Sequence, residues 1–434
     1  MHKPNACGRH LAWRRRCANL ILGAVIGAIL AASPNGSNGS AEVPRGAPVV
    51  NTETAAPVRF EPVSFSDLPG WDADDHLAAF KAFRVSCPRI KAAARAGNRA
   101  GAIAIPAPLL AACDKAAALR EPITRATTRA FFESEFTPHR VVHAASQGLL
   151  TGYYEPVLDG SRTKDDRFST PIYRRPPDLV NLVHEAERGA KANQLTHARK
   201  TAAGTEPYAT RAEIEAGALT GQNLELLYLA DPVDTFFMHI QGSGRIRLTD
   251  GTMVRVHYDG KNGHPYTSIG RYLIDTGMLA ADKITMGALG RWLRADTDRG
   301  RHVMHQNASF VFFRELHGEE AQGPLGVLSI PLVAGRSLAV DAGTHAIGTP
   351  VYVSSPALTH ASRTKKDDGF NRLMVAHDVG SAIRGPERGD IYFGSGDKAG
   401  KLAGITKHPG RFFVLLPKSE DQPPATGGPR QARQ

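Results

Sequence analysis

The spacing of hydrophobic and polar positions changes along the chain. Between about residues 71 and 137, apolar residues recur every three or four positions, for example at Leu77, Phe80 and Phe83, which is typical of amphipathic helices. From about residue 141 the pattern becomes a series of short apolar runs bounded by Gly, Pro, Asn and Asp, which is typical of strands and turns. The sequence therefore predicts a mainly β protein with a helical N-terminal part.

The residue pattern in the middle of the chain predicts strands interrupted by two helices. The pair Asp250-Gly251 lies between two apolar runs and predicts a tight hairpin. Helices are expected at residues 269–276, ending at Gly277, and at 285–294. Strands are expected at residues 141–155, 170–173, 224–229, 236–240, 245–248, 253–258 and 307–313.

The last third of the chain is rich in short strands with glycine-containing corners and has few helical signals. This combination favours a small closed barrel. Strands are expected at residues 327–330, 337–340, 350–353, 371–377, 389–393 and 411–416. Residues 419–434 are rich in Pro, Gly and Gln and are predicted to be disordered.

Length and composition place the chain among ordinary globular proteins. Its 434 residues allow two or three domains, and 42% apolar with 22% charged residues argues against general disorder. Four Cys are too few for a disulfide-dense scaffold. Cys87 and Cys113 both lie in the helical region, where a structural disulfide and two buried free thiols are alternative interpretations.

The N-terminus has the pattern of a secretory signal. Basic residues precede the apolar run 20–32, the first acid is Glu42, and small residues suit cleavage after Ala41. The apolar run is short for a permanent membrane span, although an N-terminal anchor that stays attached is the alternative. A lipoprotein would need Cys where Ser33 stands. We expect export, then a flexible linker at 42–64.

The charge balance changes once this signal is set aside. Five basic residues of the signal contribute to the net charge of +11, so the remainder carries +6. This modest balance gives no case for nucleic acid.

Several common cofactor motifs are absent from the sequence. Residues 242–245 lack the third glycine of a dinucleotide fingerprint, and residues 394–401 have the wrong glycine spacing for a phosphate loop. There is no His-Glu-x-x-His and no Gly-x-Ser-x-Gly sequence. We therefore expect neither a metal nor a nucleotide cofactor.

Carboxylates beside glycine are the remaining candidates for chemistry. Asp341, Asp378 and Asp390 each begin or end a predicted strand next to glycine, where simple turn chemistry is the alternative. Asp390 directly precedes Ile391, Tyr392 and Phe393, so desolvation could raise its pKa enough to hold a proton near neutral pH.

Aromatic and amide side chains suggest a sugar ligand. Tyrosines can stack on pyranose rings, while amides and hydroxyls can bind sugar hydroxyl and acetamido groups; the alternative is that these residues form core and turns. The candidates are Tyr153, Tyr154, Tyr258, Tyr266, Tyr392, Gln241, Ser243, Asn262 and Asn307.

Four long motifs in one order make the chain similar to a known family. They are residues 151–156 (TGYYEP), 237–245 (FMHIQGSGR), 260–270 (GKNGHPYTSIG) and 306–313 (QNASFVFF). With the aspartate-containing C-terminal run, residues 65–416 resemble the membrane-bound lytic murein transglycosylase A (MltA) family and its three-aspartate (3D) domain. The resemblance implies a helical part at 65–150, an inserted β-barrel domain at 151–315 and a double-psi β-barrel at 323–418, with a glycan groove between the two barrels.

The same resemblance implies a function and a set of site residues. It implies a lyase that cleaves the β-1,4 bond between N-acetylmuramic acid and N-acetylglucosamine in peptidoglycan strands, leaving a 1,6-anhydromuramoyl end. Motif matching places the catalytic acid at Asp390 and a supporting carboxylate at Asp378, with Asp341 as the third aspartate. Substrate contacts are expected at Thr151, Gly152, Tyr153, Tyr154, Gln241, Ser243 and Tyr392. Family members are typically lipoproteins, and Ser33 departs from that pattern, so we expect a periplasmic enzyme, with outer-membrane association as the alternative.

Two other functions fit the same residues. One is a hydrolase that uses two carboxylates, Asp390 with Asp378 or Glu155. The other is a non-catalytic peptidoglycan-binding protein in which Asp390 is structural. A lytic enzyme needs only one carboxyl as acid and then base, because the muramoyl 6-hydroxyl attacks its own C1.

Overall fold

Six strands, most of them from the last third of the chain, close into a barrel. In this computed structural model, which describes residues 57–96, 105–144, 147–183, 194–361 and 369–419, the pairing order is β17-β14-β15-β13-β16-β3 and returns to β17. The pairs β13–β15 and β16–β3 are parallel and the other four are antiparallel. The strands are β3 (Gly148–Glu155), β13 (Ser337–Val340), β14 (Pro350–Ser355), β15 (Phe370–Val379), β16 (Arg388–Ser395) and β17 (Lys407–Pro417).

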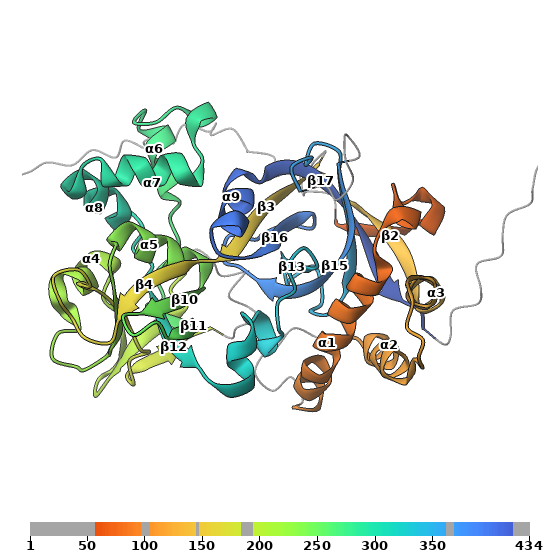
Figure 1. The fold of residues 1–434 in the computed structure, drawn as a ribbon, viewed down its shortest axis with the longest axis horizontal. Coiled ribbons are helices and arrows are strands. Elements are labelled where there is room, and N and C mark those ends of the chain that lie inside the picture. Colours follow the sequence, from red (N-terminus) through yellow and green to blue (C-terminus); the bar gives the residue numbers. More distant parts are fainter. Residues whose placement is uncertain (1–56, 97–104, 145–146, 184–193, 362–368, 420–434) are drawn as a thin grey trace, which may run out of the picture. The chain divides into compact units, whose positions relative to one another are not determined.

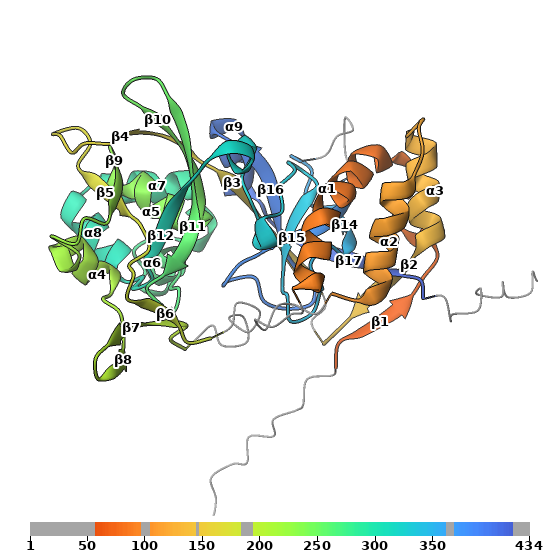
Figure 2. The ribbon, with the colours of Figure 1, turned by 90° about the horizontal axis from the view of Figure 1, so that it is seen from below.

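Two further strands and three helices complete this part of the molecule. β1 (Arg59–Pro62) and β2 (Phe136–Val142) extend the sheet outward from β17. The helices are α1 (His76–Arg95), α2 (Ala107–Ala118) and α3 (Arg125–Glu135), and Figures 1 and 2 show them together beside the barrel. Phe80, Phe83 and Ile90 form a buried stripe on α1 that packs into the same hydrophobic core as the barrel strands.

A side-chain cap fixes the start of α1, and a disulfide joins α1 to α2. The Asp75 side chain accepts a hydrogen bond from the Ala78 N–H and caps α1. A disulfide joins Cys87 of α1 to Cys113 of α2, with a Cα–Cα distance of 5.4 Å.

A second six-stranded sheet is formed by the middle of the chain. Its order is β12-β11-β10-β4-β9-β5, and Tyr173 of β5 and Phe312 of β12, from its two edges, meet in one hydrophobic cluster. The strands are β4 (Val157–Ser161), β5 (Thr170–Tyr173), β9 (Glu225–Leu229), β10 (Ser243–Leu248), β11 (Met253–Lys261) and β12 (Val311–Leu316). The predicted hairpin at Asp250-Gly251 joins β10 to β11.

Shorter elements surround this sheet. A three-stranded sheet contains β6 (Leu179–Asn181), β7 (His197–Thr201) and β8 (Gly204–Glu206). The helices are α4 (Arg211–Glu213), α5 (Pro232–Gln241), α6 (Ile269–Asp275), α7 (Met286–Arg294) and α8 (Thr297–His305), and α9 (Asp397–Ile405) packs against β3 and β16 (Figure 1). The mainly β fold, its helical N-terminal part and its barrel in the last third are confirmed.

Some predicted elements are wrong. Residues 236–240 belong to helix α5, because Asp231 accepts hydrogen bonds from the Val233 and Asp234 N–H groups and Pro232 occupies the first helical turn. The strand predicted at 327–330 is absent, because Val327–Ser329 forms a 3-10 turn. Helix α9 was missed because its glycine-rich N-terminal side resembles a loop.

Two predicted boundaries also change. The linker prediction at 42–64 is wrong over Arg59–Pro62, which pairs with β2 as a strand. The inserted domain was expected to begin at residue 151, but Gly148–Glu155 pairs with β16 and β17 in the barrel, so the second sheet begins with β4. The predicted export signal at 1–41 and the tail from residue 420 lie outside the described residues. None of the helices in the described ranges has the length and apolar character needed to cross a membrane.

Candidate active site

A row of side chains crosses one face of the barrel. Thr151 of β3 is the register partner of Asp390 in β16. Asp390 also pairs with Ala339 of β13, and Ala339 pairs in turn with Asp378 of β15. Register partners on adjacent strands share a face, and neighbouring strands lie about 4.8 Å apart. The two aspartates therefore lie on one face with their Cα atoms roughly 10 Å apart.

This row faces away from the large hydrophobic core. Leu150 and Ile391 are fully buried in that core. Because successive side chains in a strand point to opposite faces, the neighbouring Thr151 and Asp390 face outward. Both are only partly buried, so the row is accessible from solvent.

A β-bulge brings Asp378 onto this face. Leu338 pairs with Ala376, but the next residue, Ala339, pairs with Asp378, which leaves His377 as an extra residue. Without this shift the alternation of β15 would turn Asp378 to the opposite face from Asp390.

Asp390 has one oriented oxygen and one open oxygen. The Thr151 hydroxyl donates a 2.6 Å hydrogen bond to Oδ1 of Asp390, and no described residue forms a hydrogen bond with Oδ2. Burial raises the pKa of the Asp390 carboxyl, against the opposing effects of the Thr151 hydrogen bond and the positive charge of Arg388. The carboxyl can thus hold a proton and present it on its open oxygen.

Asp378 is bound through both of its oxygens. Tyr153 donates a 3.0 Å hydrogen bond from its hydroxyl to Oδ2, and the Val379 N–H donates one of 2.9 Å to Oδ1. Burial raises the pKa of Asp378 to about 7, although these hydrogen bonds lower it; the nearby Asp390 charge adds to the increase. Asp378 therefore interacts electrostatically with Asp390, but both of its oxygens already accept hydrogen bonds from the protein.

Two tyrosines lie on the same face, two residues further along β3 and β16. Tyr153 and Tyr392 are register partners whose ring centroids are 5.2 Å apart. Burial raises the pKa of Tyr392 to about 12 and raises the pKa of Tyr153 well above its ordinary value, so both hydroxyls stay protonated. With Ala339 and Ile383 the two rings form a small cluster that supports the aspartates.

Glu155 is committed to a buried ion pair. It has no exposed surface and accepts hydrogen bonds from Arg255 Nε (2.5 Å) and Nη2 (3.2 Å) and from the Ser395 hydroxyl (2.5 Å). Arg255 lies on β11 of the second sheet, whereas Ser395 ends β16 of the barrel. Glu155 thus connects the two sheets and offers no open oxygen to a substrate.

Asp341 holds the loop that connects β15 to β16. Its Oδ2 accepts a 2.7 Å hydrogen bond from the Gly385 N–H, and Arg384 lies 3.5 Å from Oδ1. This loop joins Asp378 to Asp390 in the chain. The structure therefore gives Asp341 the turn chemistry that was the alternative interpretation.

The other predicted contact residues surround β3. A Cβ at Gly152 would lie 2.5 Å from the Phe393 ring and 2.9 Å from the Ala403 Cα, so glycine is needed for close packing of α9. The Tyr154 ring packs over Gly400 of α9, while its N–H donates to Oε1 of Gln241 at 3.0 Å.

Ser243 is placed differently from these residues. It begins β10 in the second sheet and is 8% exposed. No described contact joins it to the row, and its role as a substrate contact stays a prediction.

The amides in the other sequence motifs bind backbone groups. Asn262 is fully buried and binds the Ala209 and Ala308 carbonyls and the Phe310 N–H, whereas Asn307 accepts from the Thr267 and Ser309 N–H groups. Asn262 therefore has no capacity left for a sugar, which corrects its ligand interpretation. Asn307 uses its side-chain oxygen in this way, and its role as a sugar contact stays a prediction.

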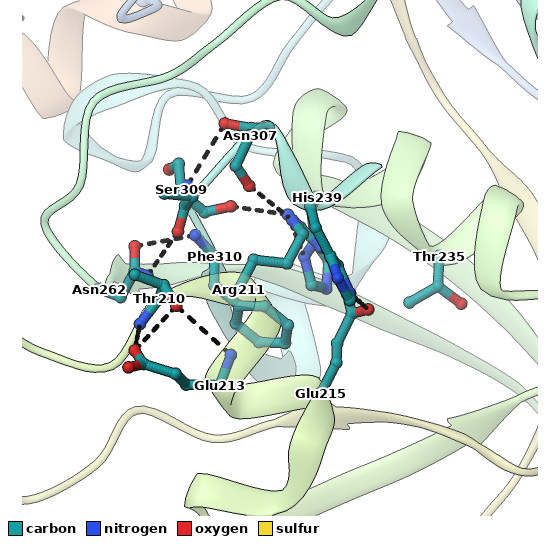
Figure 3. Close-up of polar contacts among 12 residues, drawn as sticks. Thr210, Arg211, Glu213, Glu215, Thr235, His239, Asn262, Asn307, Ser309 and Phe310 are labelled. Atoms are coloured by element: carbon teal, nitrogen blue, oxygen red, sulfur yellow. Dashed lines mark hydrogen bonds and ion pairs between the residues drawn. The ribbon is translucent and has the colours of Figure 1, made fainter. Parts of the chain in front are cut away.

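A buried arginine organises this region. Figure 3 shows Arg211 among His239, Asn307, Ser309 and Glu215. It is 1% exposed and donates to the Asn307 and Ser309 carbonyls at 3.1 and 2.7 Å and to Glu215 at 3.2 Å. The long motifs of the middle region therefore encode a buried hydrogen-bond network rather than a second site.

Two cations near Asp390 were missed by the sequence analysis. Arg388 precedes Asp390 by two residues on β16 and thus shares its face. Lys407 of β17 is the register partner of Thr151. Strand alternation could have indicated Arg388, but Lys407 becomes a neighbour only through barrel closure.

Comparison with known proteins gives consistent matches. The MltA specific insert domain matches residues 149–314 and the 3D domain matches residues 336–416. The membrane-bound lytic murein transglycosylase A of Escherichia coli K12 is 37% identical over 269 residues, 61% of this chain and 65% of that protein. The chain thus aligns with about two thirds of that relative's length.

Solved structures match over more of the chain. The crystal structure of a membrane-bound lytic murein transglycosylase from Agrobacterium tumefaciens has a TM-score of 0.72 and 38% identity, covering 82% of this chain and 97% of that one. That of Escherichia coli MltA with bound chitohexaose has a TM-score of 0.57 and 30% identity, covering 84% and 93%.

Proposed function

The chain belongs to the MltA family of lytic murein transglycosylases, and we propose that it cleaves the β-1,4 bond between N-acetylmuramic acid and N-acetylglucosamine in peptidoglycan without adding water. The product is a 1,6-anhydromuramoyl end. One observation carries the proposal: Asp390 has a raised pKa, one oxygen fixed by Thr151 and the other open on an accessible face.

In the first step Asp390 acts as a general acid. Its proton passes from Oδ2 to the glycosidic oxygen, and the electrons of the C1–O bond leave with that oxygen. The raised pKa increases the fraction of Asp390 that is protonated at a given pH, which favours its action as a general acid. Thr151 fixes the other oxygen, so the acidic oxygen keeps a defined direction.

In the second step the same carboxyl acts as a base. The muramoyl 6-hydroxyl oxygen bonds to C1, and its proton passes to the Asp390 carboxylate, which restores the starting state of the enzyme. No water is consumed and all atoms of the substrate remain in the two products. An attacking group within the same sugar ring has a high effective concentration, so no second carboxylate is needed to activate it.

The hydrolase alternative has weaker support. Glu155 is fully buried in its ion pair with Arg255, and both oxygens of Asp378 accept hydrogen bonds from the protein. A hydrolytic base needs an open oxygen and a positioned water. We assign two roles to Asp378: it holds the Tyr153 hydroxyl, and its charge influences the electrostatic environment of Asp390.

The substrate class follows from relatives and from the exposed site. The related Escherichia coli structure contains a chitohexaose, a chain of N-acetylglucosamine units. We propose that this chain binds peptidoglycan glycan strands along the Asp390 face, in a groove that includes residues of the second sheet.

We also propose a location in the cell envelope. The Cys87–Cys113 disulfide suits an oxidising compartment, and the signal pattern at residues 1–41 suits export. Relatives are named as membrane-bound, whereas Ser33 replaces the cysteine of a lipid-anchor signal. We therefore propose a periplasmic enzyme, with outer-membrane association as the alternative, and cell fractionation separates the two: recovery only with membranes would contradict the periplasmic location.

Product analysis tests the proposed reaction. Purified sacculi are digested with the protein, and the released fragments are analysed by mass spectrometry. Fragments with 1,6-anhydromuramoyl ends support the proposal. Reducing muramoyl ends would indicate a hydrolase, and binding without any product would indicate a non-catalytic wall-binding protein.

A further inference from the structure

Two cationic residues border the Asp390 row on its outer face. Lys407 is the register partner of Thr151, on the side away from Asp390. Its Cα therefore lies two strands, or roughly 10 Å, from that of Asp390. Arg388 lies two residues before Asp390 on β16, about 7 Å along the strand. Both positions are within the size of a single substituted sugar.

Neither cation is neutralised by a carboxylate in the described part of the chain. Arg388 Nη1 donates to the Gly389 carbonyl at 2.6 Å and to the Leu149 carbonyl at 3.4 Å, and Lys407 is exposed. By contrast, nearby Arg384 is paired with Asp341. Two unpaired cations beside a carboxyl that must stay protonated are costly, because their positive charge favours its ionised form.

An exposed apolar residue lies between the two cations. Leu149 is the register partner of Arg388 on one side and of Pro409, on β17, on the other. It is 38% exposed, although it lies within a paired strand. The surface therefore combines an apolar patch with two positive charges, which suits a ligand that carries a methyl group beside a carboxylate.

We propose that Lys407, Arg388 and Leu149 form a subsite for the carboxylate-bearing arm on C3 of the muramoyl ring. The subsite rests on the proposed function, since Asp390 must act at C1 of the same ring. N-acetylglucosamine has only a hydroxyl at C3 and would leave the subsite empty. The subsite thus selects muramoyl units over the neutral units of chitin-like chains.

The carboxylate has two chemical sources. On peptide-free strands it belongs to the lactyl group itself, next to the lactyl methyl. On peptide-bearing strands the lactyl carboxyl is an amide, and the free carboxylates lie on the attached stem peptide. Both sources present the same charged group to Lys407 and Arg388, and they are separated by the choice of probe.

Binding measurements on three glycans test this subsite. The measurements use the Asp390→Asn background so that no probe is cleaved, with chitohexaose, peptide-free strands and peptide-bearing strands as ligands. Lys407→Gln should weaken binding of a carboxylate-bearing strand about five-fold at low salt, with a smaller loss at high salt, and leave chitohexaose unchanged. Lys407→Arg should restore the affinity, because it keeps the charge.

The matched control is Lys401→Gln. Lys401 is an exposed lysine on α9, so it makes the same charge change away from the row and should alter none of the affinities. Arg388→Gln should also weaken binding of the carboxylate-bearing strands. Its effect is judged by binding alone, because Arg388 also lowers the pKa of Asp390.

Each outcome has one interpretation. A loss on peptide-free strands alone assigns the lactyl carboxylate, a loss on peptide-bearing strands alone assigns the stem carboxylates, and losses on both show that the subsite accepts a carboxylate from either source. An equal loss of affinity for all three glycans, chitohexaose included, overturns the subsite. No loss of affinity for either carboxylate-bearing strand overturns it as well. The proposed function is judged separately from the products of the unmodified protein, so failure of one is distinguishable from failure of the other.

Discussion

The Thr151 hydroxyl donates a 2.6 Å hydrogen bond to Oδ1 of Asp390 across 239 residues of sequence. The contact exists because β3 and β16 are parallel neighbours in the closed barrel. It fixes one oxygen of the carboxyl and lowers a pKa that burial raises. In the proposed mechanism Thr151 is therefore a positioning residue for the acid.

Replacing Thr151 tests this role. Thr151→Val keeps the shape and removes the donor, so the pKa of Asp390 should rise and the loss of rate on the alkaline side should move to higher pH. The maximal rate should fall about tenfold, because the carboxyl is less well oriented. The measurement is the pH profile of kcat.

The control for that experiment is Thr151→Ser. It keeps the hydroxyl and should retain the pH profile of the unmodified protein. An unchanged profile in Thr151→Val, or the same displacement in both variants, would show that the hydrogen bond does not set the pKa of the acid.

Asp378 should make stability depend on pH. Its pKa is about 7 in the folded protein against 3.8 for the ordinary carboxyl, so the folded state binds more protons between these values and loses stability as pH rises from about 4 to 7. Asp378→Asn removes this loss. Relative to the unmodified protein, the variant should gain about 1–2 kcal/mol over that interval and no more above it, since partial exposure screens the full effect.

Urea unfolding at several pH values measures the difference. The control is Asp298→Asn, which makes the same carboxyl-to-amide change at a side chain that is 94% exposed. A stability difference that is constant from pH 4 to pH 8 would contradict the raised pKa of Asp378.

Glu155 should matter for stability and not for the chemistry. Glu155→Gln leaves Arg255 buried without its counterion, which should cost about 3 kcal/mol in the free energy of unfolding. Adding Arg255→Met should recover part of this loss, because the uncompensated buried charge is gone. A folded Glu155→Gln protein that binds glycan but forms no product would instead place Glu155 in the reaction.

Close packing at Gly152 predicts a structural cost. An Ala Cβ would meet the Phe393 ring at 2.5 Å and the backbone of α9 at 2.9 Å, so Gly152→Ala should destabilise the protein by about 1–3 kcal/mol. The rate should also fall, because β3 carries Thr151 and Tyr153 on either side. Gly323→Ala is the control, since no atom lies within 4 Å of its Cβ and its φ of −155° suits any residue. Equal stability of the two variants would contradict the packing role.

Local patterns predicted much of the fold. The strands that form β5, β10 and β13 and the hairpin at Asp250-Gly251 are bounded by turn residues, and the helices that form α1 and α3 have clear apolar stripes. Residues 236–240 were misread because a short apolar run looks the same in a buried strand and in a helix, and the decisive Asp231 cap lies five residues earlier.

The site was harder to predict because barrel closure creates it. Asp390 was recognised from its apolar neighbours and its motif, but the approach of Thr151 and Lys407 depends on pairings between distant strands. The bulge at His377, which brings Asp378 to the same face, leaves no signal in the alternation of apolar residues. Conversely, Asn262 and Asn307 looked like ligand groups because sequence alone does not show that backbone groups already bind them.

The most direct test of the account is the product spectrum of Asp390→Asn beside that of Asp378→Asn on purified sacculi. Asn cannot deliver a proton, so Asp390→Asn should remain folded, bind glycan and release no 1,6-anhydromuramoyl fragments. Asp378→Asn should keep the anhydro product at a reduced rate, because it removes a supporting group and leaves the acid. Anhydro fragments from Asp390→Asn at the rate of the unmodified protein would contradict the assignment of Asp390 as the acid and base.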